Sequence, residues 1–283
     1  MANITTTWKL DGFVDEQRYY RSETPIDIEN LPPPTAILSA SAREYEDTVL
    51  PKKAYYVAFS SLRNNVEKIS EIRYLGDKYW NNVVFYCRLN GNTTDLSNYA
   101  HTPITIGSDV SYSATGARFG QALFVDNNIN QCITYPSTNF GFAANEDFTI
   151  EAWTYCTSKP TGFWYSAFGS WVNGTGWCLF YTPQGIAFNF RNIGLSANIA
   201  YSTSQLHAIA VTRKDSIIRL FFNGNIVATM TDNGAIASND FRIGGNLTST
   251  DWWRGYVDDI RITKGVARYT SNYNLPIKEF YDF

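Results

Sequence analysis

The chain of 283 residues is 44% hydrophobic and 16% aromatic, and its formal net charge is −3. This length predicts one large or two ordinary domains with a substantial core, and the scattered basic residues exclude the electrostatic footprint of a nucleic-acid-binding protein. No apolar run approaches the ~18 residues of a membrane span and no signal pattern follows Met1, so we expect assembly in a cytoplasm without membrane insertion.

The N-terminal region contains short strand-like segments. Residues 2–10 alternate polar and apolar side chains around Trp8, and two further strand-like runs flank a Leu-Pro turn at residues 50–53. These features resemble a fibronectin type III sandwich, in which an early tryptophan packs the core and a tyrosine after the turn, here Tyr55 or Tyr56, makes a corner hydrogen bond. Because the usual first strand would be short or absent, we expect a neighbouring chain or the second domain to cover that edge.

A change of pattern marks a domain boundary. Residues 74–82, YLGDKYWNN, contain Gly76 and Asp77 as turn signals between two strand-rich regions. The sequence therefore predicts a small domain at residues 1–76 and a larger one at residues 77–283.

Strand signals dominate the larger region. FTIEAWTYC at residues 148–156 alternates strongly, and Asn223-Gly224 separates two alternating apolar runs, which predicts a type I′ hairpin turn. No long segment shows a helical period with capping residues. We therefore predict an all-β protein with two β-sandwiches in series.

The last predicted strand holds two adjacent carboxylates. In GYVDDIRITK, strict alternation places Tyr256, Asp258, Ile260 and Ile262 on one face and Asp259 on the other. One carboxylate would then face inward or toward an edge, where it needs a partner such as a cation, an arginine or backbone N–H groups.

Five sequence blocks share their order and spacing with one family. The blocks are FGQALFVD (119–126), FTIEAWTY (148–155), LHAIAVTR (206–213), LFFNG (220–224) and FRIGG (241–245). They resemble the laminin-G-like or concanavalin-A-like jelly-roll family over residues 77–283, and the closing ITKGVARYT looks like the version found in bacteriophage structural and tail proteins. The resemblance implies a jelly roll, but it does not define a ligand.

The cysteines are expected to be free thiols. Cys87, Cys132, Cys156 and Cys178 stand singly in strand-like contexts with no CxxC spacing. Buried thiols are ordinary packing residues, and cytoplasmic assembly favours the reduced state. Neither a zinc site nor a redox motif is indicated.

The family resemblance implies a candidate calcium site. Jelly rolls of this family often bind a cation through the final Asp-Asp strand, and Ca²⁺ takes six to eight oxygen ligands. The matching positions are Asp258 or Asp259, with Asn90, Asp95 and Asp126 as further oxygens. Asn90 stands where relatives usually carry an aspartate, which removes one charge. The alternative is that Asp258 caps a loop or pairs with Arg261 or Arg242.

Aromatic side chains form a second candidate site. Carbohydrate modules stack exposed aromatic faces on sugar rings and place such residues on loops. The candidates are Trp164, Trp171 and Trp177 in or beside a glycine-rich region, and Trp252 and Trp253 before the closing strand. The alternative is that one tryptophan of each group plugs the end of the sandwich.

Catalysis is not expected. Concanavalin-like glucanases carry their catalytic carboxylates on one strand as alternating Glu, Asp and Glu, and neither EYED at residues 44–47 nor NEDFTIE at residues 145–151 keeps this arrangement. His207 matches a family position and is expected to be structural, while His101 stands alone in a loop. We therefore predict that the protein is not an enzyme.

Together these patterns favour a bacteriophage virion protein, a tail or capsid accessory component, whose jelly roll binds bacterial surface polysaccharide during host adsorption. Its other expected partners are virion proteins, with oligomerisation inside the particle, and Ca²⁺ is the one cofactor that the family resemblance suggests. The alternative is a purely structural decoration or adaptor protein that makes protein contacts without binding sugar, because protein interfaces are also rich in Trp and Tyr.

Overall fold

The computed structural model describes residues 2–49, 53–126, 131–136, 139–162, 164–245 and 252–283. Within these ranges the chain forms strands joined by turns and loops, with a single 3-10 turn, η1 (Trp80–Asn82), and no α-helix, which confirms the all-β prediction. Among the described residues, no helix is long and apolar enough to span a membrane.

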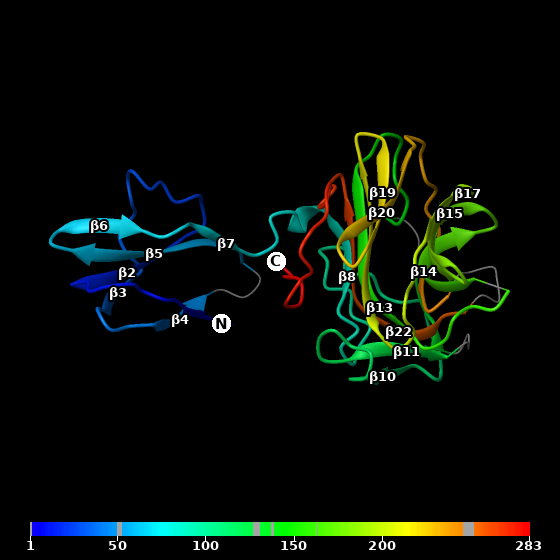
Figure 1. Ribbon diagram of the computed structural model, residues 1–283, viewed down its shortest axis with the longest axis horizontal. Coiled ribbons are helices and arrows are strands. Elements are labelled where there is room, and N and C mark those ends of the chain that lie inside the picture. Colours follow the sequence, from blue (N-terminus) through cyan, green and yellow to red (C-terminus); the bar gives the residue numbers. More distant parts are fainter. Residues whose placement is uncertain (1, 50–52, 127–130, 137–138, 163, 246–251) are drawn as a thin grey trace. The chain divides into compact units, whose positions relative to one another are not determined.

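The chain divides into two compact units (Figure 1). The first comprises Met1–Trp80 together with Tyr281–Phe283, and the second comprises Asn81–Phe280. This division lies a few residues after the boundary predicted from the sequence, and it assigns the last three residues to the first unit through bonds such as Asp77 N–H to the Phe283 carbonyl at 2.8 Å.

The first unit contains seven described strands. They are β1 (Ala2–Thr7), β2 (Glu16–Ser22), β3 (Ala36–Ser39), β4 (Glu44–Val49), β5 (Tyr55–Arg63), β6 (Val66–Ile69) and β7 (Arg73–Leu75). β1 pairs with β4, and a second sheet has the order β3-β2-β5-β6 with β7 beside β5. Trp8 packs on Phe59 at a ring distance of 4.2 Å and donates to Gln17 Oε1 at 2.7 Å. The tryptophan therefore anchors this unit, as the alternation around it indicated.

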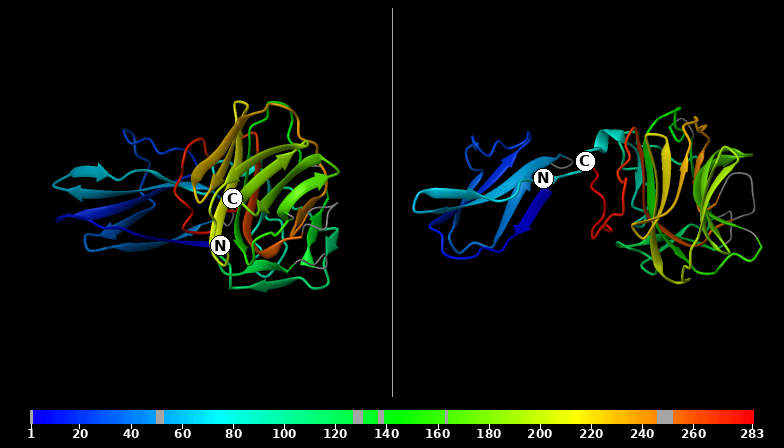
Figure 2. Two further views of the ribbon diagram at one scale, coloured as in Figure 1. Left: turned by 45° about the vertical axis from the view of Figure 1, so that its right-hand side comes forward. Right: turned by 45° about the horizontal axis from the view of Figure 1, so that its top comes forward.

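The second unit contains two larger sheets (Figure 2). Its strands are β8 (Val83–Cys87), β9 (Thr105–Ile106), β10 (Ser111–Ser113), β11 (Ala122–Asp126), β12 (Ile133–Tyr135), β13 (Phe148–Cys156), β14 (Tyr165–Val172), β15 (Thr175–Thr182), β16 (Gly185–Phe190), β17 (Ile193–Asn198), β18 (Leu206–Lys214), β19 (Ile217–Phe222), β20 (Asn225–Thr231), β21 (Phe241–Ile243) and β22 (Arg254–Lys264). We call the sheet β10-β11-β22-β13-β18-β19-β20, with β8 beside β22, the front sheet. The sheet β17-β16-β15-β14-β21-β12-β9 is the back sheet.

Alternating side chains of the two sheets meet in one core. From the front sheet, Ile150 on β13 and Val211 on β18 are buried in it, and from the back sheet so are Trp177 and Tyr181 on β15. Burying a large apolar side chain contributes on the order of 1.5–3 kcal/mol. The core of the sandwich therefore contains large aromatic side chains as well as aliphatic ones.

The predicted hairpin turn is present between β19 and β20. Asn223 and Gly224 have φ values of 49° and 78°, and Phe222 pairs with Asn225 across the turn. A type I′ turn needs positive φ at both central residues, which Asn and Gly tolerate best. The register of this edge of the front sheet is therefore set by two residues that the sequence identifies.

The four cysteines are free and buried, which confirms that prediction. Burial raises the pKa of Cys132 and of Cys156 to about 11. These thiols therefore stay protonated at neutral pH and act as small apolar packing residues.

Candidate functional site

The two adjacent carboxylates of β22 lie on a β-bulge. Glu151 of β13 pairs with Arg261 and Trp153 pairs with Asp258, so two residues, Asp259 and Ile260, stand opposite one residue of β13. Asp259 has φ of 49°, in the left-handed region. The bulge shifts the alternation by one residue, so the strict alternation predicted from the sequence is wrong across this point.

The bulge changes which residues of β22 reach the core. Val257, Ile260 and Ile262 belong to the buried apolar cluster, whereas Tyr256 is only partly buried. Strict alternation had grouped Tyr256 with the two isoleucines. The carboxylates therefore stay out of the apolar interior although both residues are only 1% exposed.

Asp258 holds a loop through backbone donors. Its Oδ2 accepts hydrogen bonds from the N–H groups of Arg118 at 2.7 Å and Phe119 at 3.0 Å, while Oδ1 has no hydrogen-bond partner within the described part of the chain. Burial raises the pKa of Asp258 to about 7. The loop-capping role that the sequence offered as an alternative is the one seen here.

Asp259 joins a polar cluster on the outer side of the front sheet. Its Oδ1 accepts from the Tyr86 hydroxyl at 2.8 Å, and Oδ2 has no partner among the described residues. Burial raises the pKa of Asp259 to about 7, and the nearby charges of Asp258 and Glu279 act in the same direction. Tyr86 also lies 3.0 Å from the carbonyl oxygen of Phe280.

The other predicted cation ligands lie elsewhere. Asp95 is saturated by five donors from Tyr86, Ser97 and His101. Asn90 Oδ1 accepts from the Gln121 N–H at 3.0 Å. Asp126 is exposed at the end of β11.

The five predicted ligands therefore do not converge. Asp258 and Asp259 are adjacent, and each offers one oxygen without a partner among the described residues, against the six to eight oxygens of a calcium site. The described residues contain no group of three or more His, Cys, Asp or Glu side chains placed to hold a metal ion. The residues present do not fit the calcium site that the family resemblance implied.

Residues 265–280, which we call the strap, cover the outer face of the front sheet (Figures 1 and 2). Thr149 of β13 donates to the Val266 carbonyl at 2.9 Å, and Thr212 of β18 donates to the Tyr269 carbonyl at 3.0 Å. The Tyr273 N–H donates to the Gly224 carbonyl at 2.8 Å. The strap therefore crosses from β13 to the hairpin turn at the edge of this sheet.

A buried ion pair lies beneath the strap. Arg261 donates to Glu151 Oε1 at 2.7 and 2.9 Å, and the Tyr269 hydroxyl donates to Glu151 Oε2 at 2.7 Å. The guanidinium carbon of Arg261 lies 3.6 Å from the centre of the Phe280 ring. Both ion-pair partners are buried by the chain's own residues.

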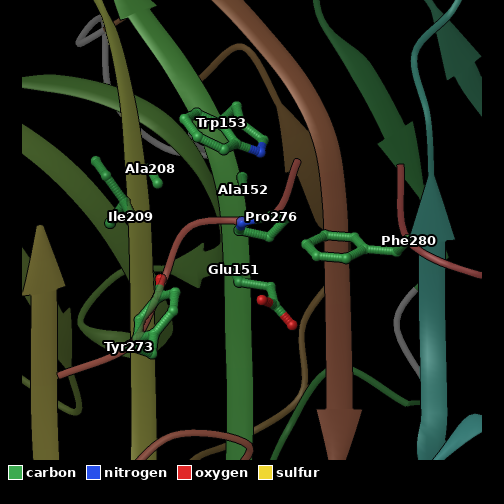
Figure 3. Close-up of a pocket in the computed structure, with 8 residues that line it drawn as sticks. All are labelled: Glu151, Ala152, Trp153, Ala208, Ile209, Tyr273, Pro276 and Phe280. Carbon is green, nitrogen blue, oxygen red and sulfur yellow. The ribbon is translucent and has the colours of Figure 1, made fainter. Parts of the chain in front are cut away.

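The strap leaves little free space above the sheet. Figure 3 shows Tyr273, Pro276 and Phe280 around the pocket formed with Glu151 and Trp153. This cavity measures about 10 Å³, close to the smallest space that admits one water molecule. It cannot hold a sugar ring, so the front sheet offers no open surface here.

The outer face of the back sheet carries aromatic side chains instead. Along β15, Trp177, Leu179 and Tyr181 enter the core, while Cys178 and Phe180 form a separate apolar cluster on the other side. Trp171 of β14 packs on this cluster, and the Trp164 ring contacts Phe180 edge to face at 5.6 Å. Trp164 is 37% exposed.

Trp252 belongs to the same face. A bridge joins it to Ser166 of β14, whose hydroxyl is bonded to Cys178 in the outer cluster. The Arg242 guanidinium lies 5.7 Å from the Trp252 ring, and Arg242 pairs with Gly169 on the neighbouring strand. We call Trp164, Trp171, Phe180, Arg242 and Trp252 the back-sheet patch.

Two of the five predicted tryptophans lie in the core. Trp177 and Trp253 are both 0% exposed. Trp177 donates to the Phe140 carbonyl at 2.6 Å, and Trp253 packs on Tyr181 at a ring distance of 5.0 Å. Neither indole can stack on a sugar here, because each is fully covered. The structure thus matches the alternative in which one tryptophan of each group plugs the sandwich.

Sequence reasoning missed three residues on this face. Phe180, Arg242 and Asn189 were not predicted, although Cys178-Leu179-Phe180 makes β15 apolar on both faces, a signal for a second apolar surface. Asn189 pairs with Cys178 on the next strand, and its Oδ1 is buried without a hydrogen-bond partner in the described part of the chain. Its amide adds a polar group beside the aromatic rings.

Both histidines have structural partners. His101 Nδ1 lies 2.6 Å from Asp95 Oδ2, and its Nε2 lies 3.3 Å from the Asn139 amide. His207 Nε2 lies 2.9 Å from the Ser202 carbonyl, and burial lowers the pKa of His207. His101 therefore does not stand alone in its loop, as the sequence had suggested, but fixes the loop together with Asp95.

The family of the second unit follows from comparison with known proteins. A model of the concanavalin A-like lectin/glucanases superfamily matches residues 126–268. This match covers about half of the chain, and the protein belongs to that superfamily. No curated protein matches the sequence.

Three solved structures share the fold. The binding domain of paraclostridial mosquitocidal protein 1 is 16% identical with a TM-score of 0.56, covering 66% of this chain and 49% of that chain. The binding domain of botulinum neurotoxin serotype G is 17% identical with a TM-score of 0.51, covering 68% and 49%. Domain 4 of AbnA, an extracellular arabinanase from Geobacillus stearothermophilus in complex with arabinotriose, is 16% identical with a TM-score of 0.51, covering 65% and 92%.

These likenesses show the jelly-roll fold alone, because sequence identity is low. The chain spans about half the length of the two toxin binding domains. Ligands named for those proteins are theirs, and a ligand for this chain has to be argued from its own residues.

Proposed function

We propose that the second unit is a non-catalytic glycan-binding module that uses the back-sheet patch. The observation that carries this proposal is that three of the predicted tryptophans, Trp164, Trp171 and Trp252, lie at least partly exposed on the outer face of the back sheet beside Arg242. Aromatic faces stack on the apolar side of sugar rings, and guanidinium and amide groups bond the hydroxyls. The superfamily of lectins and glucanases to which the chain belongs is consistent with this role.

We further propose that the protein acts in a bacteriophage virion as a tail or capsid accessory component that binds bacterial surface polysaccharide during adsorption. The support is the sequence resemblance of the closing strand and the segment ITKGVARYT. Other virion proteins and self-association within the particle belong to the same proposal. Size-exclusion chromatography with light scattering would measure the oligomeric state of the isolated protein.

For the first unit we propose a fibronectin type III-like spacer or docking domain. Its strand order, with β1 and β4 on one sheet and β3-β2-β5-β6 on the other, supports this proposal, as does the anchoring of Trp8. Among the described residues neither Tyr55 nor Tyr56 makes a side-chain hydrogen bond; instead Arg21 lies over the Tyr55 ring at 5.1 Å. The corner hydrogen bond of that family is thus one point on which this unit departs from the pattern.

The glycan proposal is tested by binding of fluorescently labelled protein to candidate host bacteria, with soluble surface polysaccharide as competitor. We expect competition with the intact protein and weaker binding with Trp164→Ala and Trp171→Ala. Tyr99→Ala is the matched control, because Tyr99 is 50% exposed but lies in a loop outside the patch. Cell binding that polysaccharide does not reduce, with both tryptophan variants unaffected, would favour the decoration or adaptor role instead.

A further inference from the structure

We infer that the back-sheet patch binds an internal stretch of a polysaccharide laid across the strands, with separate sugar rings stacked on two aromatic platforms. This inference rests on the proposed glycan function and specifies its ligand as an extended chain rather than a single terminal sugar. The first platform is Trp164, whose ring packs edge to face on the buried Phe180, and the second is Trp252 beside Arg242.

The pairing of the strands separates the two platforms. Ser166 of β14 pairs with Phe180 of β15 on one side and is bridged to Trp252 on the other. Neighbouring strands lie ~4.8 Å apart, so the backbones of Phe180, on which the first platform packs, and of Trp252 are about 10 Å apart. One sugar ring cannot cover both.

The orientation of the second platform increases this separation. The Trp252 ring lies against Gly245, since a Cβ built on that glycine would come within 2.4 Å of the indole. The Arg242 guanidinium, on the strand that follows β14 across the sheet, lies near the same ring. The indole is therefore directed away from Ser166, toward β21.

The surface between the two platforms is formed by small residues that do not protrude. Ser166 is fully buried, with its hydroxyl turned to Cys178, and the next position on the outer face of β14 is Gly169, which pairs with both Arg242 and Cys178. No large side chain of β14 rises between Phe180 and Trp252 in this row. A middle sugar of a bound chain can pass over these small residues and reach both rings.

Trp171 lies further along β14 and is not part of this cross-strand row. It pairs with Gly176 at the far end of the strand and packs on the outer cluster. We assign to Trp171 a flanking contact, while the dependence on chain length comes from the two platforms.

The test measures affinity against oligomer length with the full chain. The probes are glucan, arabinan and N-acetylglucosamine oligomers from the monosaccharide upward, measured by isothermal titration calorimetry. With a probe series that binds, we expect affinity to rise with length until both platforms are spanned and then to level off. A gain of roughly tenfold at the spanning length corresponds to about 1.4 kcal/mol.

Variants separate the two platforms. Trp252→Ala and Trp164→Ala are each expected to abolish the gain of longer oligomers, because either substitution removes one of the two platforms. Trp252→Phe should restore the length dependence, because it keeps an aromatic face. Near-ultraviolet circular dichroism checks that each variant is folded.

The outcomes are distinguishable. Equal affinity for the monosaccharide and the longest oligomer, or a Trp252→Ala variant that loses short and long oligomers equally, overturns the spanning arrangement while leaving glycan binding in place. No binding to any oligomer or to the surface polysaccharide overturns the glycan function together with this inference.

Discussion

The two outer faces of the jelly roll differ in what covers them. On the front sheet the strap lies over charged and aromatic side chains and leaves a cavity of about 10 Å³, whereas on the back sheet Trp164 remains 37% exposed and Trp171 and Trp252 are partly exposed. Both faces are rich in residues that could recognise a ligand. The difference shows that a functional surface is defined by what the rest of the chain leaves uncovered as much as by residue type.

The largest effect is expected from breaking the ion pair beneath the strap. Arg261→Ala leaves the buried Glu151 with only the more distant Arg268 guanidinium, at 3.7 Å, as an ion-pair partner, and breaking a buried pair typically costs about 3–5 kcal/mol. Urea denaturation would measure the loss, and hydrogen exchange would show faster exchange of residues 265–280. Lys214→Ala is the control, because the Lys214–Asp147 pair at 2.8 Å is partly exposed and solvent screens its attraction, so a much smaller loss is expected. Equal effects of the two variants would contradict the view that the front face is sealed.

The hairpin turn offers a second way to disturb the strap. At Gly224 φ is +78°, and a Cβ would lie 2.3 Å from the Tyr273 carbonyl oxygen, so Gly224→Ala combines backbone strain with a clash and should cost about 1–3 kcal/mol. Gly162→Ala is matched in φ, at +90°, but no atom of the described residues lies within 4 Å of the added methyl. The difference between the free energies of unfolding of the two variants measures the contact with the strap. Equal losses would contradict a stabilising contact between the turn and the strap.

The buried carboxylates predict a dependence on pH. Because the pKa of Asp258 is raised from 3.8 to about 7, the folded state binds its proton more tightly than the unfolded state. Its stabilising contribution is therefore complete below about pH 4 and is lost as the pH rises toward 7. Asp258→Asn keeps an acceptor for the Arg118 and Phe119 N–H groups and removes this slope.

The pH experiment compares the free energy of unfolding of Asp258→Asn with that of the unaltered protein between pH 5 and pH 8. We expect the variant to gain on the order of 1–3 kcal/mol relative to the unaltered protein as the pH rises through this window. Asp126→Asn, which changes an exposed carboxylate, should show no such trend. A relative stability that stays constant across this window would mean that Asp258 is already ionised in the folded protein at pH 5.

On the back sheet, truncation of an aromatic side chain should hardly affect the free energy of unfolding. Trp164→Ala removes a side chain that is 37% exposed and is expected to change the free energy of unfolding by less than about 1 kcal/mol, although it weakens glycan binding. Thermal denaturation and binding would be measured on one preparation. A large loss of stability would mean that Trp164 is a packing residue and that the back face is less open than it looks.

The smallest effect is expected from calcium. Since the predicted ligands Asn90, Asp95 and Asp126 do not join Asp258 and Asp259, adding Ca²⁺ or a chelator should leave the melting temperature unchanged. A rise in the melting temperature with Ca²⁺, in proportion to the logarithm of its concentration, would contradict this expectation.

The sequence predicted the parts of the structure that depend on local patterns. The alternation of polar and apolar residues predicted the all-β class. Asn223-Gly224 predicted a hairpin turn, because a type I′ turn needs positive φ at both of its central residues. The bulge at Asp259 was not predictable in the same way, since nothing in GYVDDIRIT separates a bulged strand from a regular one until its partners on β13 are known.

The candidate site was predicted less completely, because the sequence does not show which face of each strand points to the core. Trp171 and Trp177 lie on adjacent strands of one hairpin, yet the first reaches the outer cluster and the second the core. The choice depends on which face of each strand the sandwich closes over, which is a tertiary property. The local sequence identified candidate tryptophans, but it could not distinguish those on the outer face from those in the core.

The position of β22 has a consequence for how the molecule folds. This strand pairs with β11, β13 and β8, all of which precede it by more than ninety residues along the chain. Until β22 has been synthesised, those strands lack their shared neighbour and expose unpaired edges. Such non-local pairing is slow, with typical folding times of milliseconds to seconds for sheet proteins, and the nascent front sheet is the stage at which association between chains would compete with folding.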